Sequence, residues 1–221
     1  MKRSNTASHV TCALAAAAIA FTTTTTSASA QGNMGEGRGA GRMNQAQVTR
    51  MMQGWDASAQ EAARMMMTKY GPPMEMTATM AVWGPAGPWK RTIISKEAVQ
   101  HNFPMPHHDV MQQFVDYKVP PEMFDDLAMF DGSVIVERTK GEISARCDKE
   151  GANFLALNLA HEIVIGKRSV ADARTTYGEQ IMAMKAKRPA PYTERLMFAP
   201  TPNAADPDQP LPMSGTSSSR P

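Results

Sequence analysis

The segment from His101 to Asp109 carries the side chains best suited to binding a metal ion. It reads His-Asn-Phe-Pro-Met-Pro-His-His-Asp and holds three of the chain's five histidines. Imidazole nitrogen and thioether sulfur are both ligands for copper. A copper site is therefore one hypothesis, with the ligands His101, Met105, His107 and His108. The alternative is a polar loop in which Asp109 caps a following helix.

Cys147 is the only cysteine after position 12, and its surroundings allow two roles. A nucleophile would need a thiol pKa lowered by a nearby cation or a helix N-terminus, with a histidine as base. A core residue would share its strand face with Ile143 and Ala145, as the alternation of apolar and polar residues indicates. We predict core packing, because a free cysteine behaves as a small apolar residue. A thiol-dependent enzyme is the weaker alternative.

Two tryptophans and one further histidine are the remaining candidates. Trp83 and Trp89 flank a Gly/Pro turn, where they could offer an aromatic surface to a sugar or peptide or simply clamp a hairpin. His161-Glu162 begins like a zinc-protease helix, but Ile165 stands where the second histidine must be. Phosphate-binding, dinucleotide-binding and serine-hydrolase motifs are also missing. The sequence therefore predicts a protein without catalysis.

The elements that position these candidates alternate between helical and extended patterns. The spacing predicts a helix over 56–70, capped by Asp56, and strands over 74–82 and 89–95 that pair through the turn between them. A helix is predicted from Asp109 through Val115. Pro120-Pro121 ends it and starts a short one that stops at Asp131-Gly132.

The second half of the chain repeats the change from strand to helix. Residues 133–147 predict a hairpin with its turn at Gly141, and two helices follow at 148–166 and 169–188. Hairpins imply an antiparallel sheet, which the apolar stripes of the helices can cover. We therefore predict the α+β class, with an antiparallel sheet built from two β-hairpins packed against helices, and a C-terminal αα-hairpin.

The chain ends predict export and a single domain. Lys2 and Arg3, an apolar run over 10–21 and Ala28-Ser29-Ala30 together read as a secretory signal peptide over residues 1–30. We expect a Gly-rich disordered segment over 31–52, one α+β domain over 53–198 and a disordered Pro/Ser-rich tail over 199–221. We expect no transmembrane span, because the longest apolar run is too short.

The charge balance argues against nucleic acid as a partner. The chain has 23 basic and 21 acidic side chains, and removal of the two basic ones in residues 1–30 leaves 21 of each. Binding to phosphate groups requires a clustered positive surface, which the sequence does not show.

Three stretches of the chain resemble a group of uncharacterised secreted bacterial proteins. They read Gly-Pro-Trp-Lys-Arg-Thr-Ile at 87–93, His-Asn-Phe-Pro-Met-Pro-His at 101–107 and Asp-Gly-Ser-Val-Ile-Val-Glu-Arg-Thr-Lys-Gly-Glu at 131–142. The resemblance extends from about Trp55 to Phe198. It implies export and a single domain, and no activity, ligand or catalytic residue. The order of helix and hairpin is also similar to small periplasmic envelope-assembly modules, an analogy of fold alone.

These observations give one leading hypothesis and two alternatives. We expect an exported, soluble, non-catalytic binding or envelope-interaction module in the periplasm or outside the cell, with no cofactor. Its partner would be an envelope protein or a small ligand, and the candidate binding residues are His101, His107, His108, Asp109, Trp83 and Trp89. The alternatives are copper handling by the histidine and methionine loop and thiol chemistry at Cys147.

Overall fold

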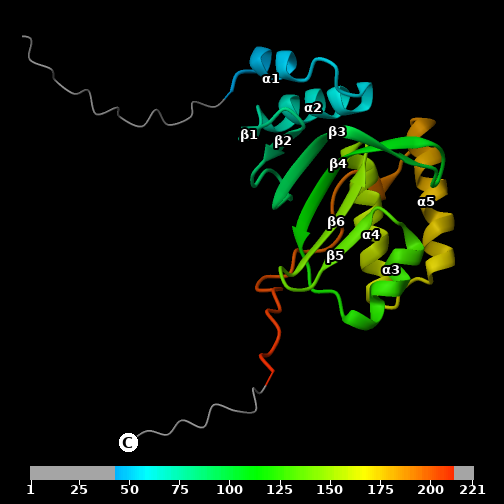
Figure 1. Ribbon diagram of the computed structural model, residues 1–221. Coiled ribbons are helices and arrows are strands. Elements are labelled where there is room, and N and C mark those ends of the chain that lie inside the picture. Colours follow the sequence, from blue (N-terminus) through cyan, green and yellow to red (C-terminus); the bar gives the residue numbers. More distant parts are fainter. Residues whose placement is uncertain (1–42, 212–221) are drawn as a thin grey trace, which may run out of the picture. The chain divides into compact units, whose positions relative to one another are not determined.

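The computed structural model describes residues 43–211, which form a six-stranded antiparallel sheet with helices packed on it (Figure 1). The strand order is β1-β2-β3-β4-β6-β5. The predicted α+β class, the antiparallel sheet and the C-terminal helix pair are confirmed. The predicted signal peptide lies outside the described residues. None of the helices within 43–211 has the length and apolar character to cross a membrane.

The bounds of the elements are as follows. The strands are β1 (Glu75–Met76), β2 (Met80–Trp83), β3 (Arg91–His101), β4 (His107–Asp116), β5 (Val134–Glu137) and β6 (Glu142–Cys147). The helices are α1 (Gln45–Met51), α2 (Ala57–Tyr70), α3 (Phe124–Phe130), α4 (Glu150–Val164) and α5 (Val170–Lys185), with single 3₁₀ turns at Pro121–Met123 and Pro191–Thr193.

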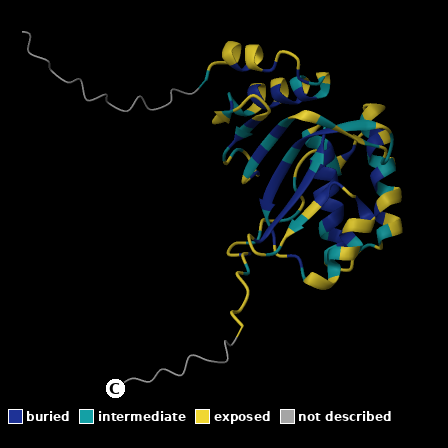
Figure 2. Cartoon of the chain, viewed as in Figure 1, coloured by how far each residue is buried: buried dark blue, intermediate teal, exposed yellow. Residues whose placement is uncertain are grey.

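The sheet carries two hydrophobic clusters, one under α4 and α5 and one under α1 and α2 (Figure 2). Gln113, at the centre of β4, is fully buried between them. Its side chain contacts Met66 of α2 at 3.8 Å and Asn153 of α4 at 3.0 Å. Because one side chain reaches both helices, α2 and α4 cover the same face of the sheet.

Helices α2 and α5 begin where the sequence predicts them, because their capping signals are local. The Asp56 side chain accepts the backbone N–H of Ser58 at 2.8 Å, and the Ser169 side chain accepts that of Asp172 at 3.1 Å. Each of these bonds satisfies a donor that a helix N-terminus leaves without an intrahelical partner. Gly71 then ends α2 in the left-handed region, with φ at 82°.

The predicted helix over 109–115 is wrong, since these residues belong to β4. The prediction rested on the apolar pairs Val110-Met111 and Phe114-Val115, which fit one helical face. In the structure all four residues are buried in a central strand. Neighbouring residues of a strand point to opposite faces, so burial of both members of each pair removes the alternation that identifies a half-buried strand.

The ordered domain extends beyond the predicted 53–198 at both ends. Part of the segment expected to be disordered forms α1, which begins with a capping box at Asn44 and buries Val48 completely. Part of the expected tail lies along the end of the sheet as a C-terminal strap, residues 199–208. The backbone N–H of Thr201 donates to Asp116 at 2.8 Å, and Ala204 is buried. These contacts join segments far apart in sequence.

A charged cluster on β3 and β6 joins the middle of the sheet. Arg91 donates two hydrogen bonds to Glu142 at 2.9 and 2.5 Å, and the Lys90 ammonium lies 2.9 Å from the same carboxylate. The bonds from Arg91 outweigh the effect of burial and lower the pKa of Glu142 to about 2. The carboxylate is therefore bound more tightly in the folded chain than in the unfolded one.

This ion pair predicts a loss of stability in acid. A depressed folded-state pKa stabilises the fold at every pH above the unfolded value, and this contribution disappears as the pH falls from about 4.5 to about 2. We expect Glu142→Gln to cost about 2 kcal/mol at pH 6 and much less at pH 2.5. Urea unfolding of both proteins over this range measures the difference. A cost independent of pH would contradict the assignment.

Candidate functional site

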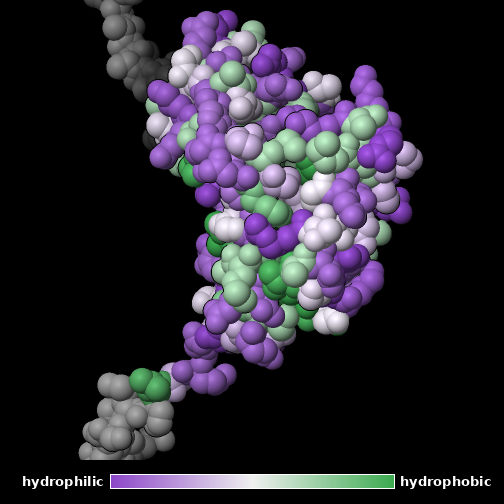
Figure 3. Space-filling view, turned by 90° about the vertical axis from the view of Figure 1, so that its right-hand side faces the viewer, coloured by the Kyte–Doolittle hydropathy of each residue, from purple (hydrophilic) through white to green (hydrophobic). Residues whose placement is uncertain are grey.

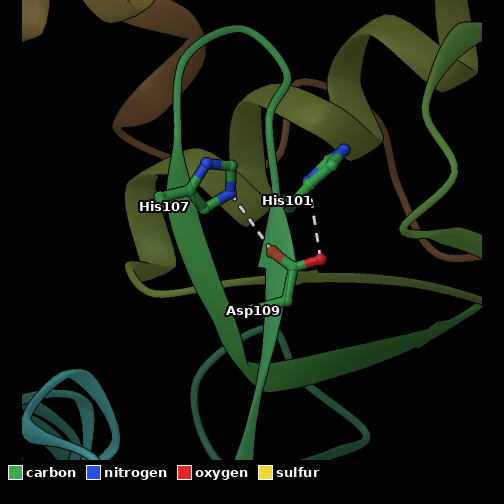
Figure 4. A group of neighbouring side chains, drawn as sticks. All are labelled: His101, His107 and Asp109. Atoms are coloured by element: carbon green, nitrogen blue, oxygen red, sulfur yellow. Dashed lines mark ion pairs between the residues drawn. The ribbon is translucent and has the colours of Figure 1, made fainter.

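The strongest cluster of chemically active side chains lies where β3 ends and β4 begins. His101 and His107 pair directly in the sheet register, and their ring centroids are 5.0 Å apart. Asp109 follows His107 by two residues, so its side chain lies on the same face of β4. Figure 4 shows both imidazoles directed toward the carboxylate. The hairpin therefore brings two nitrogen ligands and one oxygen ligand together.

Asp109 is the buried centre of this cluster, with 1% of its surface exposed. Its Oδ1 lies 3.2 Å from His107 Nε2, and its Oδ2 lies 3.5 Å from His101 Nδ1. Oδ2 also accepts the hydroxyl of Ser133. Burial alone would raise the pKa of Asp109, but the adjacent His107 imidazole and the bond from Ser133 hold it below its ordinary value. The carboxylate is thus ionised in the folded protein.

The imidazole of His107 is held in one orientation. Its Nδ1 lies 2.9 Å from the carbonyl oxygen of Met105, to which it donates. That bond leaves Nε2 as the nitrogen that faces Asp109. The carboxylate, and next the Cys147 thiol, raise the pKa of His107 to about 11. In the absence of another cation the ring is an imidazolium paired with Asp109.

Three buried polar atoms around this pair have no aligned hydrogen-bond partner among the described residues: His107 Nε2, Asp109 Oδ1 and Arg146 Nε. Such atoms are rare in folded proteins and point to an ion or water that satisfies them. One potential ligand atom from each of His101, His107 and Asp109 lies within 4.8 Å of the other two. Side chains grouped this closely could hold one metal ion between them.

Two residues that the sequence did not indicate also lie beside the histidine and aspartate cluster. Arg146 Nε lies 3.7 Å from Asp109 Oδ2, and Asp131 Oδ1 lies 3.7 Å from His101 Nε2. Asp131 is almost fully buried, and burial raises the pKa of its carboxyl. Both approach from the β5–β6 half of the sheet, so no spacing within 101–109 could indicate them. Asp131-Gly132 is recognisable in the sequence only as a helix stop.

The other predicted copper ligands lie elsewhere. His108 is on the opposite face of β4, with Nδ1 3.2 Å from Asp56 Oδ2 of the α2 cap. The Met105 sulfur lies 3.0 Å from the ammonium of Lys185 on α5. Of the four predicted ligands, the structure therefore brings only His101 and His107 into this group. The third ligand is Asp109, which is a strand residue and not the predicted helix cap.

Of the two roles considered for Trp83 and Trp89, the aromatic binding surface is not formed, because both rings are buried. The Trp83 indole donates to the carbonyl of Gly71 at 2.9 Å. The Trp89 ring stacks on Phe154 of α4 with centroids 4.7 Å apart. Each ring fixes the β2–β3 hairpin to a helix, which is a structural role.

Cys147 belongs to the main hydrophobic cluster and is buried. Burial raises the pKa of its thiol, although His107 opposes this effect. The thiol lies 3.5 Å from Asp148 Oδ1. Both nitrogens of His107 face other oxygens, so this ring is not placed as a base for the sulfur. The arrangement gives no support to thiol catalysis.

Comparison with known proteins adds no relative: no family model, curated protein or solved structure matches the chain.

Proposed function

We propose that this chain is an exported, non-catalytic binding protein for a divalent transition-metal ion, held by His101, His107 and Asp109. The observation that carries the proposal is the facing pair of His107 Nε2 and Asp109 Oδ1, buried and 3.2 Å apart without an aligned hydrogen bond. A positive species beside them stabilises this arrangement. A proton and a metal ion are the two candidates.

The fixed tautomer of His107 supports a metal ion. A ligating histidine usually donates its second ring N–H to a carbonyl or carboxylate, which orients the ring. His107 has this bond to Met105. His101 adds a second nitrogen from the neighbouring strand, so the ion would join β3 to β4.

The ligand types decide which ions fit. Two imidazoles and one carboxylate suit Zn²⁺, Cu²⁺ and other divalent ions of the first transition row, whereas Cu⁺ prefers thioether and thiolate sulfur. The Met105 sulfur lies beside Lys185 and outside the group. We therefore favour divalent copper or zinc over Cu⁺. Three protein ligands leave a position open for water.

Calorimetric titration of the full chain with Zn²⁺ and Cu²⁺ at pH 7.5 tests the proposal. We expect one ion per chain, and we expect His107→Gln to weaken binding about 100-fold or more, because it removes a ligand and its oriented ring. His108→Gln is the matched control, since His108 is adjacent in sequence but directed at Asp56. It should change the affinity by less than about twofold.

Two results would overturn the assignment. If neither ion binds below about 10 µM, the pair is a buried imidazolium–carboxylate ion pair and the positive species is a proton. If His108→Gln weakens binding as much as His107→Gln, the ion is bound by the loop histidines in another arrangement.

A further inference from the structure

A second feature lies beside the cluster, on the side that faces α5. A cavity of about 240 Å³ opens between the β3–β4 loop, the end of β6, the start of α4 and the last turns of α5. Its wall includes His107 and Cys147, so it adjoins the histidine cluster. Figure 3 views the side of the molecule on which α5 lies and shows apolar side chains gathered among hydrophilic ones.

Tyr177 of α5 contributes to the wall of this cavity a phenol that bonds no other described residue. Tyr177 of α5 is 2% exposed and lines the cavity. Its hydroxyl makes no hydrogen bond with any residue in 43–211, and burial raises its pKa well above the ordinary value. A hydroxyl that bonds nothing in the protein is able to donate its proton to an acceptor on a ligand in the cavity.

The charged groups at the cavity leave an excess of positive charge. The ammonium of Lys149 is paired with Asp148 at 2.5 Å. Lys185 also lines the cavity, and no carboxylate of the described residues lies within ion-pair distance of it. The cavity further borders the N-terminus of α4, which favours negative charge. A ligand here would present a negative group to Lys185 and an acceptor to Tyr177.

The apolar part of the cavity wall and the cavity volume indicate the size and polarity of the rest of the ligand. Pro104, Pro106 and Ile181 supply apolar surface. The cavity has room for about eight water molecules at roughly 30 Å³ each. This volume fits one ring or a short chain.

We propose that this cavity binds a small monocarboxylate with an apolar body of about one ring, its carboxylate between Lys185 and Tyr177. The cavity shares His107 with the proposed metal site but does not depend on a bound ion, because it needs no ion for its charge or its shape. Burial of apolar surface favours binding of the ligand's ring. The Lys185 ammonium and the Tyr177 phenol select its carboxylate.

Benzoate and its uncharged isostere benzamide are suitable probes, used with the full chain in EDTA so that metal binding has no influence. The first readout is ligand-observed NMR, and the second is the rate at which iodoacetamide alkylates Cys147, measured by peptide mass spectrometry. We expect benzoate to bind at least about tenfold more tightly than benzamide. We also expect it to slow alkylation, because Cys147 forms part of the wall.

Variants separate the two contacts. Lys185→Met keeps the length of an exposed side chain and should remove the preference for benzoate, whereas Lys187→Met, outside the cavity wall, should not. Tyr177→Phe should weaken benzoate binding several-fold without lowering the melting temperature, because its hydroxyl has no bond to lose. Equal binding of both probes, or no protection of Cys147 at 10 mM benzoate, would refute the proposal.

Discussion

Asp109→Asn is expected to lower the free energy of unfolding by about 3 kcal/mol, because removal of one partner from a buried ion pair leaves the other charge uncompensated. Asparagine has nearly the shape of aspartate, so packing is unchanged and the effect isolates the charge. The carboxylate is 1% exposed and faces His107, with Arg146 Nε at 3.7 Å. Without it, the partly buried side chains of His107 and Arg146 would lose the carboxylate that both face.

Urea unfolding at pH 7 in EDTA measures this loss without any contribution from a bound ion. The matched control is Glu97→Gln, which removes one negative charge from an exposed position of β3. It should change the stability by less than about 0.5 kcal/mol. If Asp109→Asn is equally mild, the substitution leaves no uncompensated positive charge behind. His107 would then be neutral in the folded protein.

The second large effect is expected at Glu150, in the first turn of α4. Its carboxylate accepts bonds from Lys69 at 2.5 Å, Tyr70 at 2.6 Å and the Trp89 indole at 2.7 Å. These donors come from the end of α2 and from the β2–β3 turn. One side chain therefore joins the two hydrophobic clusters of the domain.

Glu150→Ala should cost about 3 kcal/mol, since the buried indole and the phenol each lose their acceptor. For a domain of this size the melting temperature should fall by about 6–12 °C. Glu61→Ala, the same substitution at an exposed position of α2, is the control. In the double variant with Trp89→Phe the losses should be less than additive, because both changes remove the same bond. Additive losses would show that this bond contributes little.

The sequence predicts the helices well because their signals are local. Asp56 and Ser169 act as caps within their own turns, and the apolar stripes of α4 and α5 need no partner to be recognised. The burial of Cys147 likewise follows from alternation along β6. The β2–β3 and β5–β6 hairpins could be expected from their turns, whereas the central strand β4 could not.

The candidate site could be predicted only in part, because its geometry depends on pairing between strands. Spacing identifies His101 and His107 as candidates, yet their approach follows from the β3–β4 register, which shifts between Ile94 and Val99. Arg146 comes from a strand some forty positions further along the chain. Sequence distance also misleads for His108, which adjoins His107 but faces the other side of the sheet.

The ordered structure of the C-terminal strap could not be predicted from the sequence for a similar reason. Its composition is that of a disordered tail, and its order depends on contacts with the β5–β6 turn. Gly141 has φ at 64°, and a Cβ there would lie 2.2 Å from the backbone of Ala204. Only the folded structure shows that this glycine makes room for a distant segment.

The strap also determines how the protein can be attached to a surface. It meets β4 at Asp116, whereas the histidine cluster is at the other end of the same strand, which begins at His107. Ten residues of extended chain separate the two ends by about 30 Å. A sensor chip or fluorophore coupled through the C-terminal side would therefore leave the imidazoles unobstructed.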